Sequence, residues 1–175
     1  MQSEPEVIAA YFAGALPDGW FEGAPEVEVD REEILVVGEL PDVELPKDAS
    51  GAARDEARRA RIASFREETR GRRMRIAVDA QRRFRRKVSW GARCGELRAL
   101  FTTVSLPVMT RLRMDERRVL DTLVDAGVAR SRSHALGWCV RLVAEHESEW
   151  IEKLQEALVD VERARAEGPR SRRKS

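Results

Sequence analysis

The pattern of side chains between Val108 and Val143 constrains the fold more than any other part of the sequence. It opens with an alternating segment, Val108–Met114, whose successive side chains would lie on opposite faces of a β-strand. The face expected to pack inward holds Thr110, Leu112 and Met114, and the face expected to point outward holds Met109, Arg111 and Arg113. An amphipathic helix follows, with Asp115 as its expected N-cap and Gly127 at its end, and a second helix starts at Ser131–Ser133.

Strand, helix, turn and helix in this order resemble the ribbon-helix-helix DNA-binding family, which includes the Arc and MetJ repressors. The resemblance covers residues 104–148 and implies a dimer, because each subunit supplies one strand of an antiparallel ribbon that enters the major groove. It implies base contacts from Met109, Arg111 and Arg113. It also implies phosphate contacts from Ser131, Arg132 and Ser133, at the start of the second helix. Met109 is apolar where the family often has a polar residue.

Two apolar stripes are expected to form the core of this module. The first helix contributes Val119, Leu120, Leu123 and Val124, and the second contributes Ala135, Leu136, Cys139, Val140, Leu142 and Val143. Since a strand and two helices of this size cannot bury enough surface alone, a partner chain is expected. There is an alternative for the outward-facing arginines, in which Arg111 and Arg113 only keep an edge strand in solvent.

The net charge of +1 hides a strong polarity along the chain. Residues 1–50 contain 13 acidic and 2 basic residues, residues 51–113 contain 6 acidic and 18 basic residues, and residues 114–175 contain 12 of each. This distribution favours two interpretations equally. Either the basic middle binds an electrostatic partner, or the acidic head neutralises the middle within one fold.

The N-terminal hundred residues are expected to fold in the order α-β-β-α-α-β. The pattern predicts a helix over 6–14, a hairpin of strands at 27–29 and 34–37, a helical run over 52–86 and a strand over 87–94. We expect the helical run to break or kink near Gly71, since one helix of that length is unusual in a compact domain. The order also resembles a type II KH fold, an RNA-binding module, although residues 71–74 lack the second glycine of the KH loop.

Arginines crowd the second half of this helical run. From Arg70 to Lys87 there are 9 basic residues and a single acidic one, Asp79. That density exceeds what i,i+4 ion pairs need and favours contacts with nucleic-acid phosphates, with a solvated helix surface as the alternative. The residues assigned to nonspecific nucleic-acid contacts are Arg72, Arg73, Arg82, Arg83, Arg85 and Arg86.

The sequence offers no motif for catalysis or metal binding. The two histidines, His134 and His146, fit no nucleophile signature, and together with Cys94 and Cys139 they match no zinc spacing. We therefore expect no enzymatic activity, no metal and no cofactor. No apolar run is long enough to cross a membrane, the N-terminus lacks the basic region of a signal peptide, and two cysteines form no disulfide framework. A cytoplasmic, nucleoid-associated protein is expected.

The sequence thus predicts an α+β protein in three parts. These are an N-terminal domain over 1–103, a ribbon-helix-helix domain over 104–148, and a C-terminal helix with a basic tail over 149–175. Trp150, Leu154, Leu158 and Val161 are spaced for a helix seam that reinforces the oligomer or packs on the same chain. The predicted function is that of a transcriptional regulator, a homodimer or higher even oligomer, that binds double-stranded DNA sequence-specifically. The alternatives are an RNA- or ribosome-associated protein that uses the module only to dimerise, and a scaffold whose acidic head masks the basic middle.

Overall fold

The computed structural model describes residues 4–46 and 48–167, and the chain divides into two compact units, Met1–Pro107 and Val108–Ser175. The division lies after Pro107 rather than after Thr103, and the C-terminal helix groups with the module before it. The elements of unit 1 are α1 (Glu4–Ala15), β1 (Glu26–Val29), β2 (Glu33–Glu39), α2 (Gly51–Phe84), β3 (Lys87–Cys94) and β4 (Leu97–Leu100). The elements of unit 2 are α3 (Met114–Asp125), α4 (Arg132–His146) and α5 (Ser148–Glu167). The α+β class is confirmed.

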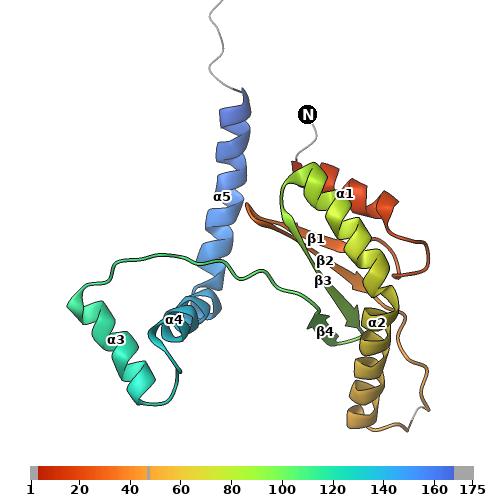
Figure 1. The fold of residues 1–175 in the computed structure, drawn as a ribbon, viewed down its shortest axis with the longest axis horizontal. Coiled ribbons are helices and arrows are strands. Elements are labelled where there is room, and N and C mark those ends of the chain that lie inside the picture. Colours follow the sequence, from red (N-terminus) through yellow and green to blue (C-terminus); the bar gives the residue numbers. More distant parts are fainter. Residues whose placement is uncertain (1–3, 47, 168–175) are drawn as a thin grey trace, which may run out of the picture. The chain divides into compact units, whose positions relative to one another are not determined.

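The sheet of unit 1 has the strand order β1-β2-β3-β4. The outer pairs are antiparallel hairpins, whereas the central strands β2 and β3 are parallel. A parallel pair needs a crossover connection, and α2 supplies it. In the central register Val36 lies beside Trp90, and α1 and α2 both cover the apolar face to which these residues belong (Figure 1).

Helix α2 runs through Gly71 without interruption, so the predicted break there is wrong. Its N-cap is Ser50, whose side chain accepts a hydrogen bond from the N–H of Ala53 at 3.2 Å. Apolar contacts on both sides of Gly71 stabilise the continuous helix: Ile62 packs with Ala92 and Cys94, and Ala80 packs in the cluster of α1. The observed order is therefore α-β-β-α-β-β, which removes the resemblance to a type II KH fold.

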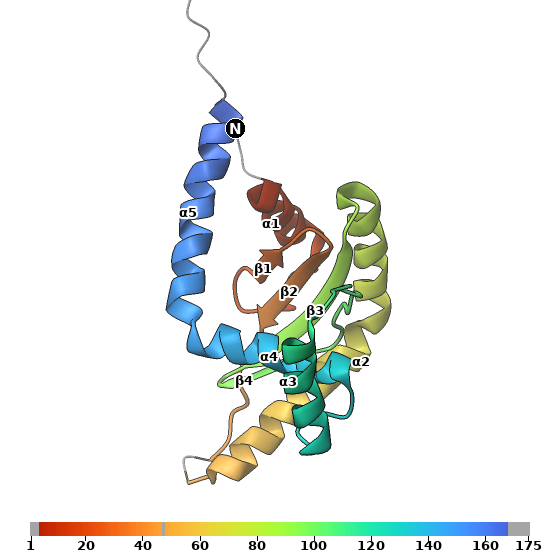
Figure 2. The same cartoon turned by 90° about the vertical axis from the view of Figure 1, so that its left-hand side faces the viewer.

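The core of unit 1 consists of two clusters on the helix-covered face of the sheet. The larger contains Ile8, Phe12, Ile34, Val36, Ala80 and Trp90. Phe12 is fully buried and meets the rings of Tyr11 and Trp90 edge to face, at centroid distances of 5.2 and 5.9 Å. The second contains Leu40, Ile62, Ala92 and Cys94, and Figure 2 shows how α2 follows the sheet along its length, which lets it contribute to both clusters.

Ion pairs join the acidic head of the chain to its basic middle inside unit 1. The shortest link Arg58 to Asp42 at 2.6 Å and Arg86 to Glu4 at 2.8 Å, and further pairs join β1 to β3 and β4. Hydrogen bonds from Arg58 lower the pKa of Asp42 well below its usual range. These contacts favour the interpretation that the head neutralises part of the middle within one fold.

Arg85 ends α2 in the left-handed conformation, with φ of 60°, where glycine is the usual residue. A residue with a Cβ is strained there, so we expect Arg85→Gly to raise the free energy of unfolding by up to about 1 kcal/mol. Arg82→Gly is the matched control, because a glycine inside the same helix should lower the free energy of unfolding by about 1 kcal/mol. Urea unfolding of both variants measures the difference, and two changes of the same sign would contradict the explanation.

Unit 2 has a small core between α3 and α4. Leu120, Ala129 and Ala135 are buried, and Leu112, Leu123, Val124, Leu136 and Cys139 pack around them. Helix α4 ends at His146, and α5 starts after Glu147, so the helix predicted from His146 onward is a separate element. The basic tail, 170–175, lies outside the described residues. Among the helices that the structure describes, none is long and apolar enough to span a lipid bilayer.

Candidate nucleic-acid interface

The segment before α3 has no strand partner within the described chain. Residues 102–113 have no regular secondary structure, and Met114 is the first residue of α3 rather than the end of a strand. One strand alone has no partner for a hydrogen-bonded ladder, so a single chain cannot display the predicted ribbon. The N-cap of α3 is Arg113 and not Asp115, and the backbone N–H of Arg113 donates to the Glu116 carboxylate.

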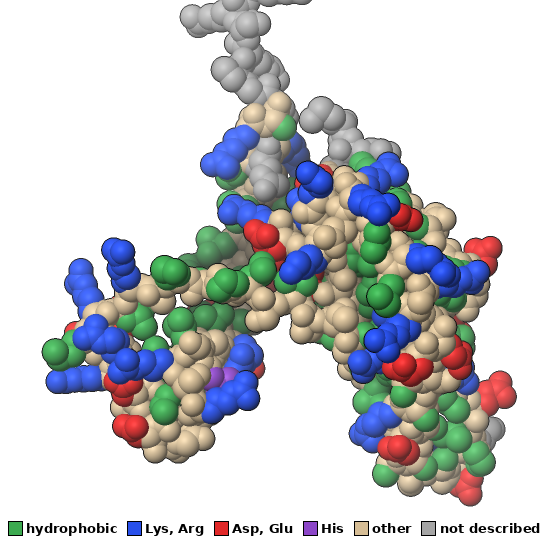
Figure 3. All heavy atoms as spheres, in the orientation of Figure 1, with side chains coloured by type: hydrophobic (Ala, Val, Ile, Leu, Met, Phe, Trp, Pro, Cys, Tyr) green, Lys and Arg blue, Asp and Glu red, His purple; other side chains and the backbone are tan. Residues whose placement is uncertain are grey.

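The alternating pattern predicts that side chains point inward and outward in turn, and the exposure of residues 111–113 agrees with it. Leu112 packs against the core of α3 and α4, while Arg111 and Arg113 on either side of it are exposed. Met109 is 98% exposed. Thr110 and Met114, predicted to point inward, are also exposed in the single chain. Figure 3 shows basic side chains gathered over this segment and the start of α3.

A turn built around Gly127 sets the start of α4 beside α3. Gly127 has φ of +75°, which residues with a Cβ adopt only under strain, and its N–H donates to the carbonyl of Val124. The chain then returns through Ala129, which is buried against Leu120 and Ala135. The predicted end of the first helix at Gly127 is thus confirmed, and the turn contributes Ala129 to the core that joins α3 to α4.

The start of α4 is exposed and has free donor groups. Ser131 is the N-cap, and its hydroxyl accepts a hydrogen bond from the N–H of His134 at 3.2 Å. Ser131, Arg132 and Ser133 are all exposed. Because the first N–H groups of a helix have no partner inside it, and the helix dipole is positive at this end, the site suits an anion such as a phosphate.

The guanidinium of Arg132 is already paired within the unit. It donates to both carboxylate oxygens of Asp121 on α3, at 2.6 and 2.8 Å. The hydrogen bond from Arg132 lowers the pKa of Asp121, and the same contact raises the pKa of Arg132. The Arg132 side chain therefore orients the start of α4, and the predicted phosphate contact there would rest on backbone N–H groups and the hydroxyls of Ser131 and Ser133.

Much of the apolar surface of α3 and α4 has no partner in the single chain. Val140 is 63% exposed and Val143 is 51% exposed, and Val119 and Leu142 are exposed as well. These four residues belong to the stripes predicted to form the core, and the structure does not place them in it. In the described part of unit 2 only Leu120, Ala129 and Ala135 are buried apolar residues.

The arginines predicted to contact nucleic acid, in α2 and directly after it, separate into two groups. Arg72, Arg82, Arg83 and Arg85 are exposed, as phosphate contacts require. Arg86 instead is tied to Glu4, which raises its pKa. Arg73 is only 6% exposed and lies over the ring of Phe101 at 4.7 Å, so it is not placed for the predicted phosphate contact. Nothing local in the sequence distinguishes these two arginines, because their partners come from distant segments.

Two comparisons with known proteins agree with the division of the chain. Residues 6–100 match the family model described as the Rv1265-like protein, N-terminal domain, and residues 113–165 match the model described as the Mb1296 C-terminal domain. The chain belongs to the Rv1265-like family. The two matched regions of this Rv1265-like chain are separated by residues 101–112, the segment that connects β4 to α3.

The relatives are similar over nearly the whole chain. Mb1296 of Mycobacterium bovis and Rv1265 of Mycobacterium tuberculosis are each 54% identical to it over 168 residues, which are 96% of this chain and 73% of the relative. MT1303 of Mycobacterium tuberculosis matches with the same identity and coverage. No solved structure matches the chain significantly.

Proposed function

We propose that this Rv1265-like protein is a non-enzymatic transcriptional regulator that binds double-stranded DNA as a dimer, at the nucleoid in the cytoplasm. Two Val108–Arg113 segments, one from each chain, pair as an antiparallel ribbon in the major groove, as in the ribbon-helix-helix family. The observation that carries the proposal is the anchoring of Leu112 in the core of α3 and α4 while its neighbours Arg111 and Arg113 remain exposed. A ribbon seated in a groove needs this division between an inner and an outer face.

The exposed apolar residues support the dimer. Val140 and Val143 lie on the same helix and are exposed, and the described part of unit 2 has three buried apolar residues. Exposed apolar residues beside so small a core are expected where a second chain completes that core. Pairing two copies about a twofold axis would bury the same stripe on both. The exposed start of α4 then supplies phosphate contacts, and the exposed arginines of α2 add sequence-independent ones.

The test measures oligomeric state and DNA binding together. We expect the wild-type protein to sediment as a dimer, and Val140→Asp/Val143→Asp to dissociate it and to weaken binding to a selected DNA site by at least about tenfold, because a charge would be buried in the dimer core. Val78→Asp is the matched control, since Val78 is a similarly exposed valine of α2 in unit 1. It should leave the dimer intact, and because it lies near the exposed arginines of α2, any loss of DNA binding should be small and equal on selected and random DNA.

Two outcomes would contradict the proposal. A wild-type monomer that binds the selected site with full affinity would remove the need for a ribbon made by two chains. A preference for structured RNA over duplex DNA at matched salt, unchanged in the Asp variants, would instead favour the RNA-associated alternative. The same preparation serves both comparisons.

A further inference from the structure

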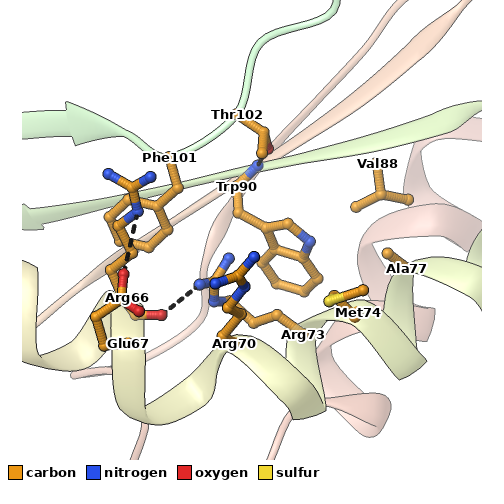
Figure 4. Close-up of a pocket in the computed structure, with 10 residues that line it drawn as sticks. All are labelled: Arg66, Glu67, Arg70, Arg73, Met74, Ala77, Val88, Trp90, Phe101 and Thr102. Atoms are coloured by element: carbon orange, nitrogen blue, oxygen red, sulfur yellow. Dashed lines mark hydrogen bonds and ion pairs between the residues drawn. The ribbon is translucent and has the colours of Figure 1, made fainter.

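We propose that unit 1 holds a second site, a pocket between α2 and the sheet that binds a small phosphorylated ligand with an apolar body. The cavity has a volume of about 330 Å³, which lies within the range of small-molecule sites. One wall is formed by Arg66, Arg70 and Arg73 of α2, and the floor is formed by Trp90 of β3 and by Phe101 (Figure 4). The proposed site does not involve unit 2 and goes beyond the proposed DNA binding.

The charges around the cavity are unbalanced. Three arginines and one carboxylate, Glu67, line it. Glu67 lies 3.8 Å from the guanidinium of Arg66, and no described carboxylate lies within ion-pair distance of Arg70 or Arg73. The exposed Arg70 is thus free to contact a ligand directly, and the buried Arg73 adds positive charge beside it. A phosphate monoester carries a charge of about −1.5 to −2 at neutral pH, which matches these positive charges.

Arg73 is the most informative of these cations because it is buried. Its guanidinium donates to the Thr69 hydroxyl at 2.9 Å and to the carbonyl of Arg66 at 2.6 Å, and it stacks over Phe101. Burial lowers its pKa, as do the positive charges of Arg66 and Arg70, whereas the carboxylate of Glu67 acts in the opposite direction. A buried cation with neutral partners is costly, and an anion in the adjacent cavity would offset that cost.

The other side of the cavity is apolar. Met74, Ala77 and Val88 line it, and Met74 is 61% exposed although its side chain is apolar. Methionine adapts to ligands of irregular shape. A ligand that packs on Met74 while its phosphate contacts Arg70 would contact both sides of the cavity. A sugar phosphate has no apolar part that could pack on Met74. Adenosine 5′-monophosphate has both parts and serves as the probe.

The experiment is isothermal titration of the full-length protein with four probes: adenosine 5′-monophosphate, adenosine, inorganic phosphate and glucose 6-phosphate. We expect the monophosphate to bind at least about tenfold more tightly than each of the other three. Arg70→Gln should weaken it by at least about tenfold, because Arg70 is exposed, lines the cavity and has no carboxylate to release. Arg75→Gln, an exposed arginine of α2 outside the lining, is the matched control and should change nothing.

Each contrary result identifies what is wrong. No binding of the monophosphate at millimolar concentration, or equal losses in the Arg70 and Arg75 variants, would overturn the site. Equal binding of adenosine would overturn the role of the phosphate, and equal binding of glucose 6-phosphate would overturn the role of the apolar wall. Since Arg111 and Arg113 lie in unit 2, their removal should leave the titration unchanged, so failure of the DNA-binding proposal remains distinguishable.

Discussion

Phe12→Ala is expected to lower the free energy of unfolding of unit 1 by about 3–5 kcal/mol, the usual cost of truncating a buried phenylalanine. The ring is fully buried, and it joins α1 to Trp90 of β3 and to the Ile34 and Val36 side chains of β2. Its loss leaves a cavity where α1, α2 and the sheet meet. Such a loss is a large part of the stability of an ordinary domain, about 5–15 kcal/mol.

The measurement is urea unfolding followed by far-ultraviolet circular dichroism. Val7→Ala is the matched control in the same helix, because Val7 is 36% exposed and its truncation removes little buried surface. Phe12→Leu should fall between the two, since it retains part of the buried volume. If Phe12→Ala cost no more than Val7→Ala, the docking of α1 would not depend on this ring.

The double variant Arg111→Ala/Arg113→Ala is expected to reduce binding to a selected DNA site by at least about 30-fold. Each bidentate contact between an arginine and a guanine contributes about 1–3 kcal/mol, so two lost contacts at the lower value cost about 2 kcal/mol, and the dimer carries each arginine twice. Both side chains are exposed, and Leu112 between them is held by the core, so their removal should leave the fold intact. Competition titrations against random-sequence DNA at fixed salt measure the effect.

The control must match the change in charge. Arg163→Ala/Arg165→Ala removes two exposed arginines from α5 and should weaken binding only slightly, and equally on both DNAs. A loss in the first variant that is the same on selected and random DNA would assign Arg111 and Arg113 to phosphate contacts. An unchanged affinity would support the alternative in which they only solvate an edge.

Elements with a strong local pattern could be predicted from the sequence. The apolar residues 34–37 indicated β2, and the alternation of Val88, Trp90 and Ala92 indicated β3. Strand β4 was missed because it is short, although Gly95 with φ of +54° forms a tight turn before it and was the available signal. The unbroken course of α2 could not be predicted, because it depends on packing against strands from both sides of it in the sequence.

Contacts between segments that are distant in the sequence also decided which parts of the candidate sites could be predicted. Gly127 and the Ser131 cap are local features, and the structure places them as expected. The burial of Arg73 depends on Trp90 and Phe101, and the pairing of Arg86 depends on Glu4, so no local pattern could separate these arginines from exposed ones such as Arg72. The pocket beside Arg70 was missed for the same reason.

The parallel pairing of β2 with β3 has a consequence for how the chain folds during synthesis. Glu33 pairs with Lys87, so the central ladder can close only after the whole of α2 has left the ribosome. Until then β2 is paired with β1 alone, so its other edge is open and Ile34, Val36 and Val37 lack the cover that buries them in the folded protein. Contacts so distant in sequence form slowly, whereas α3 and α4 are neighbours joined by a short turn. We therefore expect the nascent chain to be most prone to aggregation while it ends within α2.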